Sequence, residues 1–346
     1  MTATPSRPAR DDARDPAVGD LTEGELLARF VPHLGAPAAG LVGPGDDCAV
    51  LAAPDGRVVV STDVLVEDVH FRRAWSSAHD VGRRAAVQNL ADVAAVGAVP
   101  TGLVVALVVP PTLPARWVED LARGLDDACR PWGAGVVGGD LARGPHVVVA
   151  VTVHGDLEGR APVLRSGARP GDVVAHAGVR GRSAAGYALL AAGRADDDAV
   201  PARTRAVVLD AFRVPAPPVA AGRAAALAGA TAMLDVSDGL LRDAGRLAAA
   251  SGVVLALDDP ADVLADELGL LAPVADALGA DARDWVLTGG EDHGLLATFP
   301  PGTTLPDGFR ALGRVLAAPG GAAGVTVAGS RAHEGGGWDH FGPGRR

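Results

Sequence analysis

The chain has 346 residues, of which 48% are hydrophobic, and its formal net charge is -11. It is long enough for two domains with filled cores, and its charge would repel nucleic acids and nucleotides unless divalent cations intervene. All 31 basic side chains are arginine, and the absence of lysine excludes enzymes that depend on a P-loop, protein-kinase or Schiff-base lysine.

Residues 1–20 are rich in Pro, Arg, Asp and Ala and have no apolar periodicity, so they predict a disordered extension. They lack the apolar stretch of a secretory signal, and later apolar runs end before the roughly 20 residues that crossing a bilayer takes. We therefore expect a cytoplasmic protein, with neither nucleic acid nor a membrane as its partner. Cys48 and Cys129 have no CxxC spacing, which argues against a disulfide framework or a zinc site, and both are expected in the core.

The first predicted domain spans residues 21–157. Apolar runs on either side of a turn at residues 54–56 predict two strands within residues 47–66. A helical repeat of apolar residues from about 79 to 97 places Asp92 on a face that can look into a cleft. The remaining elements complete an alternating α/β unit: a strand at 103–109, a helix at about 115–131, and strands at 135–138 and 146–154.

The second predicted domain spans residues 158–346. It follows a stretch rich in Gly, Pro and Arg at 157–172, which is typical of a domain boundary. The predicted elements are a strand at 173–177, helices at 181–193, 202–212 and 217–229, a strand at 233–236, a helix at 239–251, a strand at 253–257, a helix at 262–278, and strands at 285–289, 295–299, 309–316 and 324–328.

Short acidic motifs separate these elements. They are GDDCAV (45–50), STDVLVEDVHF (61–71), NLAD (89–92), GGD (138–140), DVSDG (235–239) and GGEDHG (289–294). Each is expected to place carboxylates at the end of an apolar run, where a side chain can face a cleft. Oxygen ligands from many separate segments are what Mg²⁺ and Ca²⁺ require. The set therefore favours phosphoryl transfer assisted by divalent cations.

Each motif also has an ordinary structural explanation. Asp46 and Asp47 suit a turn in which Asx side chains cap their own backbone. Residues 61–63 suit a polar strand edge, Asp92 a solvated helix face and Asp140 a turn cap.

The DVSDG motif excludes one cation site and leaves another open. Asp235, Ser237 and Asp238 lack the alternating spacing and the later glutamate of an EF-hand. Ser237 or Asp238 could cap the helix that follows, but capping does not explain Asp235. The GGEDHG motif suits a solvated loop. The joint occurrence of all these motifs is much less expected than any one of them, and it favours a shared cation site.

The ordered set of motifs resembles the thiamine-monophosphate kinase family, in the superfamily of aminoimidazole ribonucleotide synthetase. The matching segments are GDD, STD followed by VHF, NLAD, GGD, LRSGARPGD, DVSDGL, GGED and the closing GWDHF, and they span residues 43–341. The resemblance implies a two-domain α/β (α+β) fold, with an N-terminal mixed sheet covered by helices and a C-terminal α/β domain. It also implies ATP-dependent phosphorylation of thiamine monophosphate to thiamine diphosphate, several Mg²⁺ ions, and a homodimer formed through the N-terminal domains.

The resemblance further implies roles for individual residues, matched motif by motif. The implied metal ligands are Asp47, Ser61, Thr62, Asp63, Asp92, Asp140, Asp235 and Asp238. The implied ATP contacts are Gly139, Asp140, Arg165 and Ser237, and the implied substrate contacts are His70, Glu291 and Trp338. An indole face suits a cationic heteroaromatic ring.

We expect direct in-line transfer, because a phosphate monoester is mostly dianionic at neutral pH and needs little help from a general base. The carboxylates expected to be catalytic are Asp63, Asp92, Asp140 and Asp235. The family's usual GGEDYEL, GGDTT and VEG read GGEDHGL, GGDLA and VED here, so His293, Leu141 and Asp68 depart from its pattern.

Two other functions remain open. One is another ATP-dependent synthetase of the same superfamily, against which the GWDHF segment argues. The other is a non-catalytic protein that binds a nucleotide or divalent ion, against which the intact carboxylate set argues.

Overall fold

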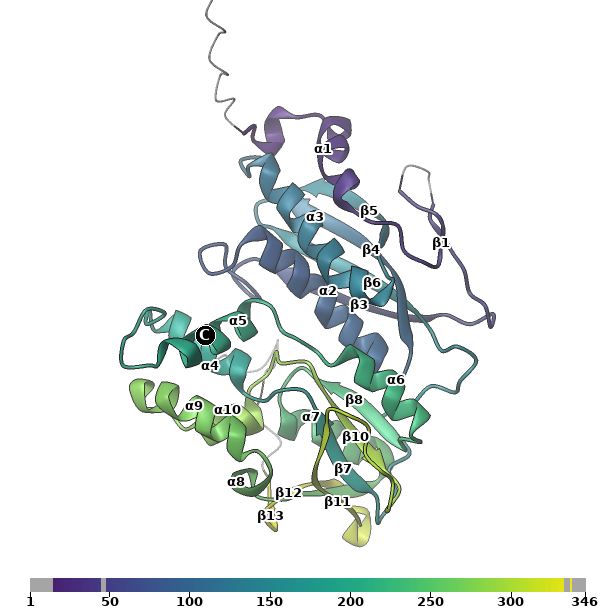
Figure 1. Ribbon diagram of the computed structural model, residues 1–346, viewed down its shortest axis with the longest axis vertical. Coiled ribbons are helices and arrows are strands. Elements are labelled where there is room, and N and C mark those ends of the chain that lie inside the picture. The colour runs from purple at the N-terminus through teal and green to yellow at the C-terminus, as the bar shows by residue number, and fades with distance from the viewer. Residues whose placement is uncertain (1–14, 45–47, 333–336, 338–346) are drawn as a thin grey trace, which may run out of the picture.

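The computed structural model describes residues 15–44, 48–332 and 337, and its two main β-sheets lie one in each half of the chain (Figure 1). The first half contains η1 (Val18–Asp20), α1 (Glu23–Phe30), η2 (Val31–His33), β1 (Gly40–Val42), β2 (Val50–Leu51), β3 (Val59–Val66), α2 (Ala78–Ala95), β4 (Val99–Val109), α3 (Ala115–Cys129), η3 (Arg130–Trp132), β5 (Val136–Arg143) and β6 (Val148–Asp156). The second half contains β7 (Val173–Ala177), α4 (Arg182–Ala191), α5 (Ala202–Arg213), α6 (Val219–Leu227), β8 (Ala232–Val236), α7 (Leu240–Ser251), β9 (Val253–Leu257), α8 (Pro260–Val263), α9 (Ala265–Leu278), α10 (Ala282–Thr288), β10 (Gly294–Phe299), β11 (Phe309–Ala317), η4 (Pro319–Gly321), β12 (Gly324–Val327) and β13 (Ser330–Arg331).

The first half is built on a mixed sheet with the strand order β3-β6-β4-β5. Strand β6 runs antiparallel to both of its neighbours, whereas β4 and β5 are parallel. Helices α2 and α3 lie side by side over one face of this sheet (Figure 1). Because only every second side chain faces the helices, buried and half-buried residues alternate along β6. The other face of the sheet therefore keeps partly exposed side chains.

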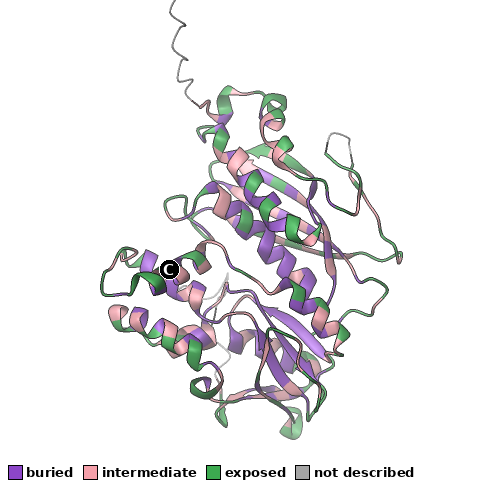
Figure 2. Ribbon diagram, in the orientation of Figure 1, coloured by how far each residue is buried: buried purple, intermediate pink, exposed green. Residues whose placement is uncertain are grey.

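The second half is built on a sheet with the strand order β13-β12-β9-β11-β7-β10-β8. Only the β9 and β12 pair is parallel. Every residue of β10 is buried, as expected for a strand covered on both faces. Figure 2 shows burial concentrated in this sheet and along α2.

Helix α6 packs the two halves together. A side chain at Gly222 would place its Cβ 2.0 Å from the carbonyl oxygen of Ala94, so only glycine allows α6 to approach α2 this closely. One continuous hydrophobic core includes Leu90 of α2 and Leu295 of β10. Helix α2 is therefore held against the second sheet, and side chains from both halves can meet beside it.

The structure corrects several predicted elements. The segment 285–289, predicted as a strand, forms the end of helix α10 and its C-cap, Gly289. The helix begins where Asp281 accepts a 2.8 Å hydrogen bond from the Arg283 N–H. The helix predicted at 262–278 is divided into α8 and α9 at Leu264. Strand β5 continues to Arg143, so GGD lies within a strand instead of at its end.

The start of the chain also differs from the prediction. Val18 is buried and its N–H donates a 2.7 Å hydrogen bond to the Leu113 carbonyl, so an extension reaching residue 20 is too long. Helix α1, opened by a capping box at Thr22, was not predicted. Cys129 is buried as expected, whereas Cys48 is exposed. Within the described residues, no helix combines the length and the apolar character needed to span a membrane.

Candidate active site

Helix α2 carries a polar stripe on one face. Arg84, Gln88 and Asp92 are spaced at i, i+4 and i+8, so they share a face of the helix. The stripe contacts three other segments through Arg84 Nη2 to Glu291 Oε2 at 2.6 Å, Gln88 Nε2 to Asp63 Oδ2 at 3.3 Å, and Ser61 Oγ to Asp92 Oδ2 at 2.7 Å. The stripe therefore links the segments that form the candidate site.

Ser61, Thr62 and Asp63 were predicted as metal ligands together, but strand β3 places them on two different faces. Successive side chains of a strand point to opposite faces, so Ser61 and Asp63 face α2 while Thr62 faces the other side of the sheet. There Thr62 Oγ1 donates to the Val151 carbonyl at 3.0 Å and accepts from Thr152 Oγ1 at 3.2 Å. Asp63 lies in the middle of the strand, and not at its end as predicted.

Strand β8 presents Asp235, which is buried, beside α2, just before the turn that leads into α7. The N-cap of α7 is Gly239, and neither of the two predicted N-cap residues takes this position. Instead, the carboxylate of Asp243 accepts hydrogen bonds from the N–H groups of Asp238 at 2.9 Å and Gly239 at 3.1 Å. Asp238 is paired with Arg246 at 2.7 Å. The turn is thus held by Asp243, and Asp235 takes no part in capping.

The loop before β10 completes the cluster. Glu291 and His293 both have positive φ, at 69° and 53°, a conformation that non-glycine residues rarely adopt. The His293 ring lies between two carboxylates, with Nδ1 3.7 Å from Asp235 Oδ2 and Nε2 3.6 Å from Glu291 Oε2. Arg84, Glu291, His293 and Asp235 therefore form a chain of alternating charge.

Gly294, which follows His293, has a specific packing reason. A Cβ at this position would lie 2.4 Å from Nε2 of His176, a fully buried residue of β7. Burial, aided by the Arg180 guanidinium, holds the pKa of His176 well below its usual range. Position 294 is therefore glycine because any larger side chain there would displace the His176 ring.

The carboxylates of the cluster repel one another. Burial, with Asp235 and Asp63 nearby, raises the pKa of Asp92 to about 7. Burial also raises the pKa of Asp63, and the Asp235 and Glu291 carboxylates add to this rise. Such crowding of like charges from β3, α2 and β8 is typical of a functional site.

Glu291 and His293 behave in the opposite way. Burial alone would raise the pKa of Glu291, but Arg84 and His293 outweigh it and hold that pKa well below its usual range. Burial alone would lower the pKa of His293, but the Asp235 and Glu291 carboxylates outweigh it and raise that pKa to about 10. Both residues are therefore charged at neutral pH.

The donor chemistry of Asp63, Asp92 and Asp235 fits Mg²⁺. Over the described residues, no three or more His, Cys, Asp or Glu side chains lie close enough to enclose an ion by themselves. Mg²⁺ does not need such a cage, since it usually takes one or two carboxylates and completes its shell with water and substrate phosphates. The residues fit a magnesium site that is completed by a phosphate ligand.

Gly139 and Asp140 lie outside this cluster. Both belong to β5, at the opposite edge of the first sheet from β3. The pairings Thr62 with Thr152, Thr152 with Val104 and Val104 with Gly138 place Asp140, two residues further on, on the same open face as Thr62.

The other predicted residues are spread around the site. The carbonyl of Arg165 accepts from Ser251 Oγ at 3.1 Å, at the end of α7 that is remote from Asp235. His70 Nδ1 accepts from the Val66 N–H at 3.0 Å in the turn after β3. The Ser237 carbonyl accepts from the Glu291 N–H at 2.7 Å. Asp47 and Trp338 lie outside the described residues, and all of these roles stay predictions.

The other two departures from the family pattern have simple surroundings. Asp68 has a φ of 66°, the conformation that the glycine of VEG would adopt without strain, and aspartate tolerates it better than most residues. Leu141 is half-buried and packs against the first core. Neither residue contributes to the carboxylate cluster.

Arg84 was not predicted as a site residue. Its signal in the sequence was present, because it lies one helical turn before Gln88 and two before Asp92. A charged residue on the apolar side of the predicted helix would have identified Arg84 as a candidate site residue.

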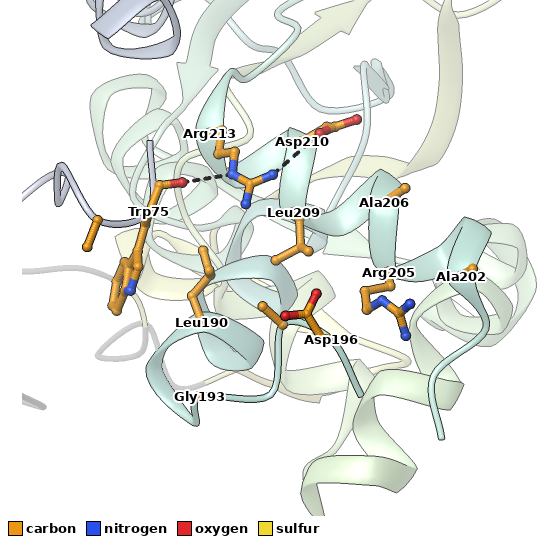
Figure 3. Close-up of a pocket in the computed structure, with 12 residues that line it drawn as sticks. Trp75, Leu190, Gly193, Asp196, Ala202, Arg205, Ala206, Leu209, Asp210 and Arg213 are labelled. Carbon is orange, nitrogen blue, oxygen red and sulfur yellow. Dashed lines mark hydrogen bonds and ion pairs between the residues drawn. The ribbon is translucent and has the colours of Figure 1, made fainter. Parts of the chain in front are cut away.

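A separate cavity of about 570 Å³ lies between α4, α5 and the segment around Trp75 (Figure 3). In Figure 3 the Arg213 side chain points toward Trp75, whose carbonyl accepts a 2.8 Å hydrogen bond from Arg213 Nε. The Trp75 ring lies 6.0 Å from that of Phe212, which packs 5.2 Å from the Arg84 guanidinium. The cavity contains none of the predicted residues, but its wall supports the polar stripe.

Comparisons with known proteins are consistent along most of the chain. Residues 45–157 match the family model for the N-terminal domain of AIR synthase related protein, and residues 169–298 match that for its C-terminal domain. The chain is 47% identical over 327 residues to a thiamine-monophosphate kinase of Mycobacterium tuberculosis, which covers 94% of both chains. It is 42% identical over 319 residues to that of Corynebacterium glutamicum, which covers 91% of this chain and 92% of the relative.

A solved structure agrees with these relatives. AaThiL complexed with AMPPCP and TMP superimposes with a TM-score of 0.73 and 31% identity, covering 82% of this chain and 87% of that chain. The expected two-domain fold of the aminoimidazole ribonucleotide synthetase type is therefore confirmed.

Proposed function

The chain belongs to the thiamine-monophosphate kinase family, whose members phosphorylate thiamine monophosphate with ATP, and from this premise we propose how its own residues carry out the transfer. The observation that carries the proposal is that Asp63, Asp92 and Asp235 come from three elements and both halves of the chain and still act on one another's charge beside α2. The two substrates are anionic, and a protein without lysine has to neutralise them by other means.

We propose that Asp63, Asp92 and Asp235 hold Mg²⁺, with Asp47 as a further ligand. When bound, Mg²⁺ would screen the repulsion between the two phosphate groups and stabilise the charge that develops during transfer. The protein's own part is positioning, because the acceptor phosphate of thiamine monophosphate has a second pKa around 6 and is already a nucleophile at neutral pH. No side chain is needed as a general base for direct in-line transfer.

The remaining roles follow from the family. Glu291, His70 and Trp338 are proposed to hold the thiamine part of the substrate, and Arg165 and Ser237 to contact ATP. Supporting this division, Glu291 lies on the far side of His293 from Asp235 and is partly exposed, with 33% of its side chain accessible. We also propose that the enzyme acts in the cytoplasm, where ATP is available.

We further propose a homodimer formed through the open face of the first sheet. Val60 and Val64 of the edge strand β3 are 60% and 44% exposed on this face, and exposed apolar side chains that lie together are typical of an interaction surface. Thr62 and Asp140 share the face, so their proposed metal roles depend on what covers it.

The Val64→Glu variant tests the dimer. It should fold, since Val64 is exposed in the single chain, but the charge should prevent close pairing, and light scattering should report half the mass of the wild type. Arg57→Glu, an exposed change outside the sheet, is the control. An unchanged mass for Val64→Glu would contradict the proposed interface.

The activity itself is tested by following ADP release with Mg²⁺-ATP in the presence and absence of thiamine monophosphate, with analysis of the product. Thiamine diphosphate formed in equal amount to ADP is expected. ADP release that ignores thiamine monophosphate would instead point to another reaction of the superfamily.

A further inference from the structure

Arg84 is the most completely enclosed charge that touches the site. Its side chain is 2% exposed, and it joins three segments of the chain. Nη2 lies 2.6 Å from Glu291 Oε2, Nη1 donates to the Phe212 carbonyl at 2.9 Å, and the guanidinium packs against the Phe212 ring. A charge-assisted hydrogen bond in such surroundings is both strong and directional.

These contacts exclude a direct role in phosphate binding. Both terminal nitrogens of Arg84 already donate to oxygen acceptors, and Nε is buried without a partner among the described residues. Arg84 could reach a substrate phosphate only by giving up Glu291 or Phe212. Its action on a substrate therefore has to pass through another residue.

Glu291 is that residue. Only Oε2 of its carboxylate is engaged by described residues, with Arg84 at 2.6 Å and His293 at 3.6 Å, while Oε1 has no such partner. Its N–H is tied to the Ser237 carbonyl at 2.7 Å. The carboxylate is thus fixed at the backbone and at one oxygen, and its second oxygen is left to accept a hydrogen bond.

We infer that Arg84 is a positioning residue for thiamine monophosphate, which holds Glu291 so that Oε1 receives the cationic, amine-bearing heteroaromatic part of the substrate. This inference rests on the proposed function. The chemistry is complementary, because the aminopyrimidine offers N–H donors and the thiazolium is positively charged, whereas Oε1 is an anionic acceptor. We assign no ATP contact to Oε1.

The test is a double-mutant cycle on steady-state kinetics with Arg84→Ala, Glu291→Gln and the double variant. Arg84→Ala should raise KM for thiamine monophosphate roughly tenfold or more, as expected for loss of a charge-assisted hydrogen bond. KM for ATP and kcat should stay within about threefold of the wild type. Because Arg84 acts through Glu291, the double variant should be no worse than Glu291→Gln alone.

Two further variants separate positioning from general stability. Arg84→Lys keeps the charge but not the two-pronged geometry, and it should restore part of the lost affinity. Arg182→Ala breaks another arginine pair, with Glu267 at 2.8 Å, which includes neither Glu291 nor His293, and it should lower the melting temperature without changing KM for thiamine monophosphate. Melting curves and binding of thiamine monophosphate by calorimetry accompany each variant.

The outcomes are distinct. Equal rises in both KM values, additive effects in the double variant, or the same kinetic pattern in Arg182→Ala would overturn the inference alone. A wild-type protein that neither binds thiamine monophosphate nor forms thiamine diphosphate would overturn the proposed function and this inference with it.

Discussion

Asp292 and the cluster of Asp63, Asp92 and Asp235 are both buried and acidic, but the protein treats them differently. Asp292 accepts hydrogen bonds from the N–H groups of Gly181 at 2.5 Å and Ser183 at 2.8 Å, and the Arg180 guanidinium lies 3.9 Å away. It thereby anchors the start of α4. Both of its oxygens accept hydrogen bonds from the fold, although burial still raises the pKa of Asp292 above its usual range.

The cluster is not satisfied in this way. Asp63 receives one long hydrogen bond, at 3.3 Å from Gln88, and Asp92 receives one from Ser61. Burial, together with repulsion from the Asp235 and Asp63 carboxylates, raises the pKa of Asp92 to about 7. The difference teaches that burial of an acid does not mark a ligand site, whereas burial without sufficient donors does.

The comparison is tested most strongly at Asp63. Asp63→Ala should lower kcat by roughly 10³-fold or more, because a ligand of the cation that stabilises the transferring charge is lost. The fold should survive, since Gln88 is the one donor among the described residues that Asp63 accepts a hydrogen bond from. Thiamine diphosphate formation at saturating Mg²⁺ and circular dichroism provide the two measurements, and near-normal turnover would contradict the metal assignment.

The reverse pattern is expected at Asp292. Asp292→Ala leaves the Gly181 and Ser183 N–H groups without their acceptor and Arg180 without a counter-charge, which should lower the free energy of unfolding by about 3 kcal/mol. Urea denaturation measures this change.

Asp292→Asn keeps one acceptor oxygen and should lose less. Activity per folded molecule should fall far less than in Asp63→Ala. A fully stable but inactive Asp292→Ala protein would show that the two groups of acids had been assigned the wrong way round.

Much of this contrast could be predicted from the sequence, but not all of it. Helix α2 followed from its apolar spacing, and so did the placing of Gln88 and Asp92 together on a neighbouring face. The opposite orientation of Thr62 could also have been predicted, because side chains alternate along a strand and Thr62 must point away from Ser61 and Asp63. Treating the three as one set overlooked that periodicity.

Other features depend on contacts between distant segments. GGD suggests a turn, yet a Cβ at Gly139 would lie 2.0 Å from the Val105 carbonyl oxygen, so the glycine serves close pairing within a sheet. Glu291 and Asp292 are neighbours in one motif, and nothing local distinguishes the acid that meets Arg84 from the one that anchors α4. A short apolar run such as 285–289 fits a strand or a helix equally well, and Asp281 decides the outcome.

The smallest expected effect concerns Asp92 and the pH dependence of stability in metal-free protein. Below pH 4 this carboxyl is neutral in both the folded and the unfolded chain. Between about pH 4 and 7 the unfolded chain loses the proton first, because the folded-state pKa is raised to about 7, so the free energy of unfolding falls as pH rises. Above pH 7 the full penalty remains.

Asp92→Asn removes that penalty and retains an oxygen that can accept the hydrogen bond from Ser61. In buffer with a chelator, the variant should gain stability over the wild type as pH rises from 4 to 7, by about 1.4 kcal/mol for each unit by which the folded-state pKa of Asp92 is raised. Added Mg²⁺ should raise the melting temperature of the wild type and leave that of the variant nearly unchanged. If the wild type were the more stable at pH 8 without metal, Asp92 would belong with Asp292 among the acids that the fold satisfies.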